Sequence, residues 1–147
     1  RKTVPGLRLA QKYAVQCGGG NNHRLGLYDG ILIKENHIRA AGSITNAIKN
    51  IIKTGVLAGS LQVEVESLDD LEEALASGEK PVLLDNFSIE LLHQAVTLTD
   101  QRAKLEASGN INLSNIRVVA ITGVDFVSSG YITKNVKAVD LSLQFER

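Results

Sequence analysis

The chain has 147 residues and a mass of 15.8 kDa, and its 16 basic side chains are balanced by 16 acidic ones, which gives a formal net charge of zero and a pI of about 7.0. This balance argues against the broad basic surface that nucleic acids or anionic membranes would require. Hydrophobic residues make up 44% and charged residues 22%, as in ordinary globular domains, and no run of about 18 apolar residues predicts a transmembrane helix.

The first residues do not resemble a targeting signal. Arg1, Lys2 and Thr3 have no apolar stretch behind them, so no signal peptide is expected. The chain contains no methionine, which favours a segment of a longer protein. Its single cysteine, Cys17, is interpreted as a small buried hydrophobic residue. A single cysteine cannot form an internal disulfide and suits a reducing compartment, so we expect a cytoplasmic protein.

Strand-like and helix-like segments alternate along the chain. Serines that can cap a helix precede apolar residues at helical spacing, and glycines follow them. These patterns predict helices at 43–59, 67–78, 88–103 and, less clearly because the residues also suit a strand, 112–122. Short β-like runs are predicted at 13–17, 31–34, 61–66, 82–85, 104–108, 126–129 and 139–145.

This alternation indicates βαβ units and a parallel sheet. The acidic residues Glu64, Asp85 and Glu106 follow one another at intervals of 21 residues, which fits a repeating strand–turn–helix unit. We therefore predict one α/β domain over residues 1–147: an incomplete (β/α) barrel of the TIM-like type, with parallel strands and outer helices. A doubly wound, flavodoxin-like sheet is the alternative.

Side-chain alternation within the strands indicates where a site would lie. Val63 and Val65 face one side of their strand, and Glu64 and Glu66 face the other. Helices would bury the valines, so the charges would line the inner face near the strand's carboxyl end, where barrel enzymes have their active sites. Antiparallel edge strands with charges in water would show the same alternation.

The first group of candidate site residues is cationic. A cluster of arginine, lysine and histidine would suit a small ligand with two or more negative groups. Lys34 closes an apolar strand and is either a site lysine or one that extends to solvent, whereas Gly18–Gly20 is only a weak phosphate signal. The members of this group are Arg1, Lys2, Arg8, His23, Arg24 and Lys34.

The other two groups are carboxylates and small polar residues. Carboxylates at a barrel mouth can hold Mg²⁺, accept sugar hydroxyls or stabilise developing positive charge. The simpler interpretation is that they form salt bridges to the cations, and the two interpretations are compatible. Ser-Gly pairs at late strand ends suit a phosphate cradle or an ordinary turn. His93 is expected to be structural. The groups comprise Glu64, Glu66, Asp85 and Glu106, and then Ser108, Gly109, Asn110, Ser128, Ser129 and Gly130.

Eight blocks of the sequence resemble one enzyme family in order along the chain. They are 1–8 (RKTVPGLR), 18–27 (GGGNNHRLGL), 33–37 (IKENH), 63–66 (VEVE), 84–87 (LDNF), 105–110 (LEASGN), 122–125 (TGVD) and 140–143 (DLSL). The sequence is similar in these blocks to quinolinate phosphoribosyltransferases, also called nicotinate-nucleotide pyrophosphorylases (carboxylating). The resemblance implies an incomplete α/β barrel that lacks the family's N-terminal α/β domain.

The resemblance also implies an activity in NAD biosynthesis. Family members transfer phosphoribose from phosphoribosyl pyrophosphate to quinolinate with decarboxylation, which gives nicotinate mononucleotide, pyrophosphate and CO₂, and they require Mg²⁺. They are expected to act as homodimers or larger assemblies, whose site receives an arginine from the partner's N-terminal domain. Glu35 stands where many members have aspartate, which is a conservative departure from the family's pattern.

The roles implied for individual residues follow the family's motifs. Lys2, Glu64 and Asp85 would be catalytic, with Glu64 and Asp85 also facing Mg²⁺. The substrate-binding positions would be Arg1, His23, Arg24, Lys34, Ser108, Gly109, Ser129 and Gly130.

Three other functions are compatible with these residues. A sister phosphoribosyltransferase could use a different acid. An aldolase-like barrel enzyme could form a Schiff base on Lys34. A non-catalytic barrel could bind anionic metabolites.

Overall fold

The structure, a computed structural model, describes residues 2–55, 61–78 and 81–145. Five parallel strands form one sheet in the order β1-β2-β3-β4-β5. This sequential order and uniform direction rule out both the doubly wound sheet, whose strand order is permuted, and the antiparallel alternative. The strands are β1 Ile31–Ile33, β2 Leu61–Val65, β3 Val82–Asp85, β4 Leu105–Ser108 and β5 Phe126–Val127.

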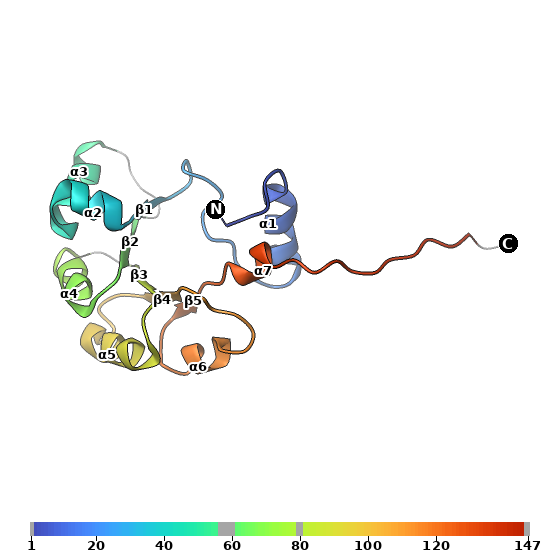
Figure 1. Cartoon of the computed structure of the whole chain (residues 1–147). Helices are drawn as coiled ribbons and strands as arrows, with labels where there is room; N and C mark the ends of the chain where they lie inside the picture. The colour runs from blue at the N-terminus through green and yellow to red at the C-terminus, as the bar shows by residue number, and fades with distance from the viewer. Residues whose placement is uncertain (1, 56–60, 79–80, 146–147) are drawn as a thin grey trace.

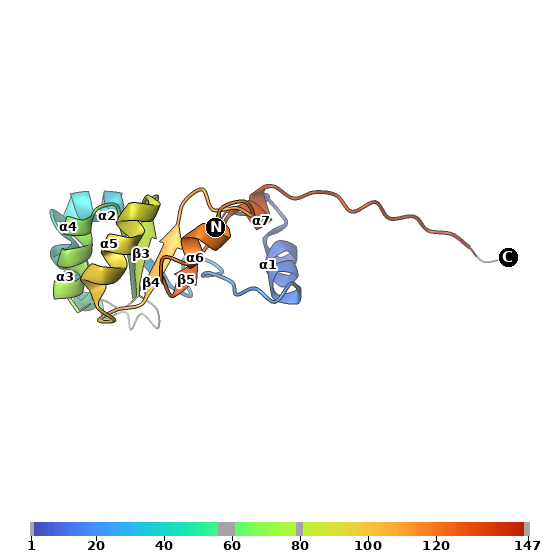
Figure 2. The ribbon, with the colours of Figure 1, turned by 90° about the horizontal axis from the view of Figure 1, so that it is seen from below.

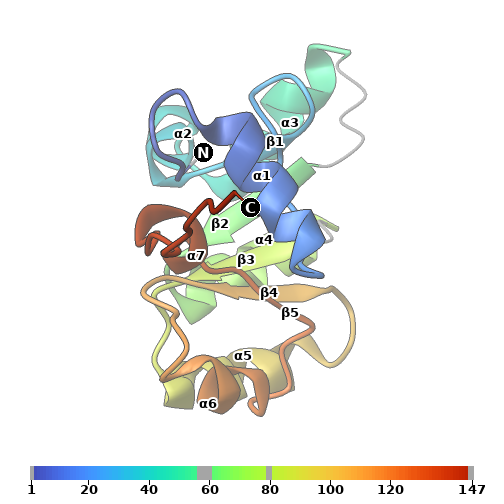
Figure 3. The same ribbon diagram turned by 90° about the vertical axis from the view of Figure 1, so that its right-hand side faces the viewer.

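The helices divide into two groups around this sheet. Helices α2 to α6 cover one side of the curved sheet, whereas α1 and α7 lie on the other (Figure 1). Figure 3 looks onto that second side, with α1 and α7 in front of the strands. The predicted incomplete barrel with outer helices is therefore confirmed. The helices are α1 Arg8–Cys17, α2 Glu35–Ala41, α3 Ile44–Lys53, α4 Leu68–Ala76, α5 Ile89–Thr99, α6 Ile116–Ala120 and α7 Tyr131–Lys134.

Three outer helices begin at the serines that the sequence indicated. Each serine side chain accepts a hydrogen bond from the backbone N–H three residues later, at 3.1 Å for Ser43, 3.1 Å for Ser67 and 3.2 Å for Ser88. Such a cap satisfies one of the N–H groups that a helix start leaves without a partner. The helices end earlier than predicted, and residues 56–60 of the predicted helix 43–59 lie outside the described residues.

The two faces of the sheet differ in chemistry because side chains alternate along each strand. Ile33, Val63 and Val82 are in register and pack against the outer helices with at most 1% of their surface exposed. Gln62 and Glu64 point to the opposite, inner face and are also buried. The outer face therefore holds the apolar core, and the inner face holds polar groups that need partners.

The strand predicted at 13–17 is wrong, because these residues form the end of α1. Tyr13 and Val15 favour strands, but they sit within a longer run of helix-forming residues that begins at Arg8. Cys17 is exposed and not buried as expected. Helices α2 and α7 were not predicted from the sequence.

The strand predicted at 139–145 is wrong as well. Residues 135–145 have no regular secondary structure, and they extend away from the fold (Figure 2). An alternating pattern produces a strand only where a neighbouring strand accepts its hydrogen bonds, and the described residues provide none here. None of the described helices has the length and apolar character needed to span a bilayer.

Candidate active site

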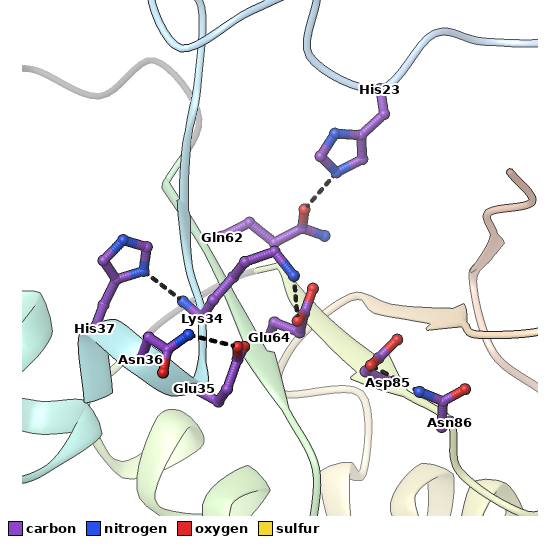
Figure 4. Close-up of polar contacts among 9 residues, drawn as sticks. All are labelled: His23, Lys34, Glu35, Asn36, His37, Gln62, Glu64, Asp85 and Asn86. Carbon is purple, nitrogen blue, oxygen red and sulfur yellow. Dashed lines mark hydrogen bonds and ion pairs between the residues drawn. The ribbon is translucent and has the colours of Figure 1, made fainter. Parts of the chain in front are cut away.

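A lysine–glutamate ion pair joins the carboxyl ends of the first two strands. The Nζ atom of Lys34, directly after β1, lies 2.5 Å from Oε1 of Glu64 in β2 (Figure 4). The Glu64 side chain is 8% exposed and the Lys34 side chain 40% exposed. The backbone N–H of Lys34 also donates to Nδ1 of His37, at 3.0 Å, which fixes the junction between β1 and α2. The predicted pairing of a site cation with a strand-end carboxylate is thus present.

Asp85 ends the next strand on the same face. Its backbone partner in β4 is Ser108, and its carboxylate accepts a hydrogen bond from the side-chain amide of Asn86, at 2.8 Å. Asn86 has a left-handed backbone, with φ of 57°, and accepts a second hydrogen bond from Asn110 at 3.2 Å. This short chain of amides orients the Asp85 carboxylate, which lies beside Glu64 in Figure 4.

The equal sequence spacing of the three acids does not place them at equal height. Glu64 is in register with Leu83, and Leu83 is in register with Glu106. Asp85 therefore lies two residues farther toward the carboxyl end than its neighbours, on the same face. Glu66 shares the face of Glu64 beyond the end of β2 and is exposed.

A second polar group lies deeper on the inner face. The Nε2 atom of His23 is 2.9 Å from Oε1 of Gln62, and Nε2 of Gln62 donates to Oε2 of Glu106 at 2.8 Å. Gln62 is only 7% exposed. His23 and Glu106 were among the residues predicted for the site, whereas the glutamine that connects them was not.

The loop that carries His23 is fixed by a buried lysine. Nζ of Lys12, in α1, donates to the backbone carbonyls of His23 at 2.6 Å and Arg24 at 2.9 Å. Burial of the ammonium group is the main cause that lowers the pKa of Lys12, with a smaller lowering from Arg8 and an opposing contribution from Asp29. The backbone N–H groups of Gly26 and Leu25 lower the pKa of Asp29, whose carboxylate closes the same loop.

The structure does not bring Arg24 to the carboxylates. Its guanidinium donates to the carbonyl of Gly30 at 3.1 Å, and Gly30 precedes the first residue of β1. Arg24 therefore lies toward the amino end of that strand, whereas Lys34 follows the carboxyl end. Arg8 donates to the carbonyl of Leu25, at 3.0 Å, and supports the same loop. Arg1 lies outside the described residues.

Lys2 lies against the loop that follows β5. A side chain added at Gly130 would meet Cδ of Lys2 at 3.0 Å, so the two residues are in close contact. The hydroxyl of Ser129 donates to the carbonyl of Ile111 at 2.5 Å, and the hydroxyl of Thr133 donates to the carbonyl of Lys2 at 2.5 Å. Three residues predicted for catalysis or phosphate binding are therefore neighbours.

Gly109 occupies a position that only glycine fits. Its φ is +98°, and a Cβ there would lie 2.2 Å from Oδ1 of Asn86. The turn after β4 therefore closes onto the amide that orients Asp85. Ser108 is partly buried next to it, and its carbonyl accepts from the backbone N–H of Asn86 at 2.9 Å.

The arrangement places one strong cation, two carboxylates and glycine-containing turns around one end of the sheet. Such a set can bind an acid through Lys34 and stabilise positive charge through Glu64 and Asp85. Within the described part of the chain, no three metal-ligating side chains cluster. Two carboxylates still suit Mg²⁺, because this ion is commonly held by one or two carboxylates together with substrate phosphates.

Sequence reasoning missed the residues that hold these groups in place. Lys12 and Gln62 belong to none of the blocks that carry the family resemblance, and Asn86, although it lies in the block 84–87, was given no role; each of the three acts through a neighbour. The alternation in β2 could have indicated Gln62, because it shares a face with Glu64.

Comparisons with known proteins agree on one family. Residues 1–144 match the sequence model of the quinolinate phosphoribosyl transferase C-terminal domain. The probable nicotinate-nucleotide pyrophosphorylase [carboxylating] of Bacillus subtilis is 44% identical over 143 residues, which cover 97% of this chain and 50% of that protein. The chloroplastic nicotinate-nucleotide pyrophosphorylase [carboxylating] of Arabidopsis thaliana is 43% identical over 164 residues, which cover 99% of this chain and 47% of that protein.

Solved structures show the same similarity in three dimensions. The nicotinate-nucleotide pyrophosphorylase of Francisella tularensis superimposes with a TM-score of 0.92 at 54% identity, covering 98% of this chain and 51% of that one. NadC of Streptococcus pyogenes gives a TM-score of 0.90 at 44% identity, covering 99% and 51%. The chain thus spans about half the length of the relatives it matches.

Proposed function

The chain belongs to the quinolinate phosphoribosyl transferase C-terminal domain family, and from this premise we propose that the intact protein makes nicotinate mononucleotide from quinolinate and phosphoribosyl pyrophosphate. Pyrophosphate and CO₂ are the other products, and the reaction serves NAD biosynthesis. The observation that carries the proposal is the ion pair between Lys34 and Glu64, which puts a cation for the acid directly beside a carboxylate for the sugar.

The binding step depends on the cations of the inner face. Quinolinate has two adjacent carboxylates, so it needs more than one positive group. Lys34 offers an ammonium on a side chain that is 40% exposed, and His23 offers a ring whose orientation Gln62 fixes. These cations hold the quinolinate ring in position against the sugar, which lowers the activation barrier by several kcal/mol. Orientation of two reactants can contribute up to ~7–11 kcal/mol in all.

The glycosyl transfer then builds positive charge on the ribose. The ring nitrogen attacks the anomeric carbon as pyrophosphate leaves, through an oxocarbenium-like transition state. Glu64 and Asp85 lie on the same face and stabilise this charge electrostatically. Lys2, next to Gly130, neutralises the departing pyrophosphate. The quaternised ring nitrogen finally accepts the electrons released by decarboxylation at the adjacent carbon.

We propose Mg²⁺ as the metal of this reaction. Glu64 and Asp85 would hold it together with substrate phosphates, and the ion would supply charge neutralisation at pyrophosphate. We also propose that a second copy of the protein completes the site. Cytoplasmic location is part of the same proposal, since the single cysteine suits a reducing compartment, although the Arabidopsis relative is named as chloroplastic.

An aldolase-like mechanism is disfavoured by the same ion pair. A lysine that forms a Schiff base must lose its proton before it attacks a carbonyl. In this structure Nζ of Lys34 is instead held in an ion pair with the carboxylate of Glu64, at 2.5 Å.

The test is a coupled assay on the full-length protein, with and without Mg²⁺. We expect nicotinate mononucleotide to form with release of ¹⁴CO₂ from labelled quinolinate, only when Mg²⁺ is present. Pyrophosphate release without ¹⁴CO₂ would point to a sister phosphoribosyltransferase that uses another acid. No turnover under any of these conditions would favour a non-catalytic barrel.

A further inference from the structure

Gln62 is a buried amide that joins a histidine on one side to a carboxylate on the other. Its oxygen lies 2.9 Å from Nε2 of His23, and its nitrogen donates to Glu106 at 2.8 Å. The residue is 7% exposed, so water cannot readily replace either partner. Neither contact is needed to hold the apolar core, which lies on the opposite face of β2.

The carboxylate end of this chain sets the direction of every hydrogen bond in it. The carboxylate of Glu106 can only accept, so the atom of Gln62 that faces it must be the NH₂ group. The carbonyl oxygen of Gln62 then faces His23 and can also only accept. Nε2 of His23 must therefore carry a proton, and Nδ1 is the ring atom left to meet a ligand (Figure 4).

We propose that Gln62 and Glu106 are positioning residues that lock His23 with its proton on Nε2, so that His23 binds a substrate carboxylate through Nδ1 only when the ring is doubly protonated. This rests on the proposed function, in which His23 contacts quinolinate. A histidine free to change tautomer could donate from Nδ1 while neutral. The locked ring cannot, so substrate binding takes up one proton.

Charged residues of both signs lie near His23, and they can also affect how the affinity for quinolinate depends on pH. His23 and Arg24 share one loop, whose backbone Lys12 holds from α1. The charged residues on the loop of His23 and on the elements beside it are Lys12 in α1, Arg24 in the same loop, Lys34 after β1, Glu64 in β2 and Glu106 in β4. Among them, Glu106 is the one that reaches the ring through Gln62, so its replacement isolates the effect of the lock.

The decisive measurement is the quinolinate dissociation constant of the full-length protein between about pH 6 and pH 8, the range in which histidine changes charge. For the natural protein we expect affinity to fall about tenfold per pH unit once His23 is neutral, because one proton is taken up on binding. In Glu106→Gln, the new amide can donate as well as accept, so the side-chain amide of Gln62 can rotate by 180° and present either its oxygen or its NH₂ group to His23. His23 can then carry its proton on either ring nitrogen. We expect less than a threefold fall per pH unit there.

A second variant and two controls separate this lock from a general loss of structure. Gln62→Met removes the acceptor for Nε2 and should flatten the pH dependence in the same way. Gln94→Met and Glu72→Gln alter an exposed glutamine and an exposed carboxylate on outer helices, and both should keep the natural slope. Titration of quinolinate itself is common to all five proteins, so only differences between slopes count. Equal slopes in Glu106→Gln and the natural protein would overturn the proposal.

A spectroscopic test does not depend on activity. The ¹⁵N shifts of the His23 ring, assigned by their loss in His23→Asn, report which nitrogen carries the proton in the neutral form. We expect the Nε2–H tautomer in the natural protein and a mixture in Glu106→Gln. An Nδ1–H ring in the natural protein would refute the lock, whether or not quinolinate binds. Failure to bind quinolinate, with the Nε2–H tautomer present, would refute the proposed function and the ligand role of His23, but not the lock.

Discussion

Two lysines form ion pairs of nearly the same length at opposite ends of the sheet. Lys34 lies 2.5 Å from Glu64 at the carboxyl end, and Lys104 lies 2.6 Å from Asp125 at the amino end. Their environments differ, since the first pair has side chains 40% and 8% exposed and the second 67% and 28%. Only the first pair combines a reachable cation with a buried carboxylate.

Replacing Lys34 tests whether it binds the acid. We expect Lys34→Ala in the full-length protein to lower kcat/KM for quinolinate by an amount equivalent to about 2–5 kcal/mol, because a buried charge loses its partner and the substrate loses a cation. Steady-state kinetics with quinolinate as the varied substrate measure this. An unchanged kcat/KM would remove Lys34 from the site.

Lys104→Ala is the matched control for that experiment. It breaks an ion pair of similar length next to neighbouring strands, but at the amino end of the sheet. Exposed pairs of this kind contribute about 0–1 kcal/mol to stability, so the urea midpoint should move little. The kinetics with quinolinate should be those of the natural protein.

Gly109 and Gly78 both have a left-handed backbone, but their surroundings differ. An added Cβ at Gly109 would overlap Asn86, with Oδ1 at 2.2 Å and the backbone nitrogen at 2.8 Å, whereas nothing lies within 4 Å at Gly78. Gly78→Ala should therefore lose only about 1–2 kcal/mol of unfolding free energy from backbone strain. Gly109→Ala should lose a further 1–3 kcal/mol, roughly, from overpacking. Urea denaturation of both variants measures the difference, and equal losses would contradict the tight approach of Asn86.

The sequence predicted the residues of the site better than their arrangement. Glu64 could be identified because alternation in a short strand places it opposite buried valines. Arg24 belonged to the same predicted cation cluster, yet its guanidinium binds the Gly30 carbonyl at the other end of β1. A short motif shows which charges are present, but the path of the loop that carries them depends on contacts such as that of Lys12.

At the level of elements, one carboxylate couples two outer helices. Glu73 in α4 accepts a hydrogen bond at 2.9 Å from the backbone N–H of Thr45, in the first turn of α3. This backbone hydrogen bond is the main cause that lowers the pKa of Glu73. It provides α3 with a cap from a neighbouring helix, in addition to the cap from Ser43.

The lowered pKa of Glu73 predicts a contribution to acid stability. A carboxyl group whose pKa is lower in the folded protein binds fewer protons in the folded state than in the unfolded state. It therefore stabilises the fold at pH values above its unfolded-state pKa, and this stabilisation is lost as pH falls through its folded-state pKa. Glu73→Gln should reduce the unfolding free energy at neutral pH by on the order of 1 kcal/mol, a value kept small because the side chain is only partly buried and solvent screens its charge.

The pH profile distinguishes this contact from a general charge effect. Below about pH 4, where carboxyl groups gain protons, the stabilities of Glu73→Gln and the natural protein should converge. Glu72→Gln removes the same charge from the same helix at an exposed position, so it should follow the natural profile. A constant difference at every pH would show that the carboxylate charge is not the cause.

Elements with local signals were predictable, and those that depend on distant partners were not. Helices α3, α4 and α5 begin at serines whose caps involve only the next three residues. The alternating residues 139–145 carry a strand pattern, but a strand exists only with a partner, which no local rule can supply. Helix α1 was mistaken for a strand because five residues are too few to distinguish a period of two from one of 3.6.

At the scale of the whole molecule, a neutral net charge coincides with exposed apolar surface. The extended residues after α7 expose Leu141 at 84% and Leu143 at 86%, and α1 exposes Leu9 at 78% and Tyr13 at 69%. Charge repulsion between molecules is weakest near the pI of about 7.0, so these surfaces can meet most readily there.

We therefore expect the 147-residue chain to associate most strongly near pH 7 and to dissociate as its net charge grows at higher or lower pH. Replacing Leu141 and Leu143 together with aspartate should reduce association at pH 7, because it removes apolar area and adds charge at one place. Leu113 and Ile121 lie on either side of α6 and are 83% and 71% exposed, so Leu113→Asp combined with Ile121→Asp adds the same charge outside the extended segment and serves as the control. Light scattering across pH measures the association. If both double variants dissociate equally, net charge alone governs association and the extended segment has no special part in it.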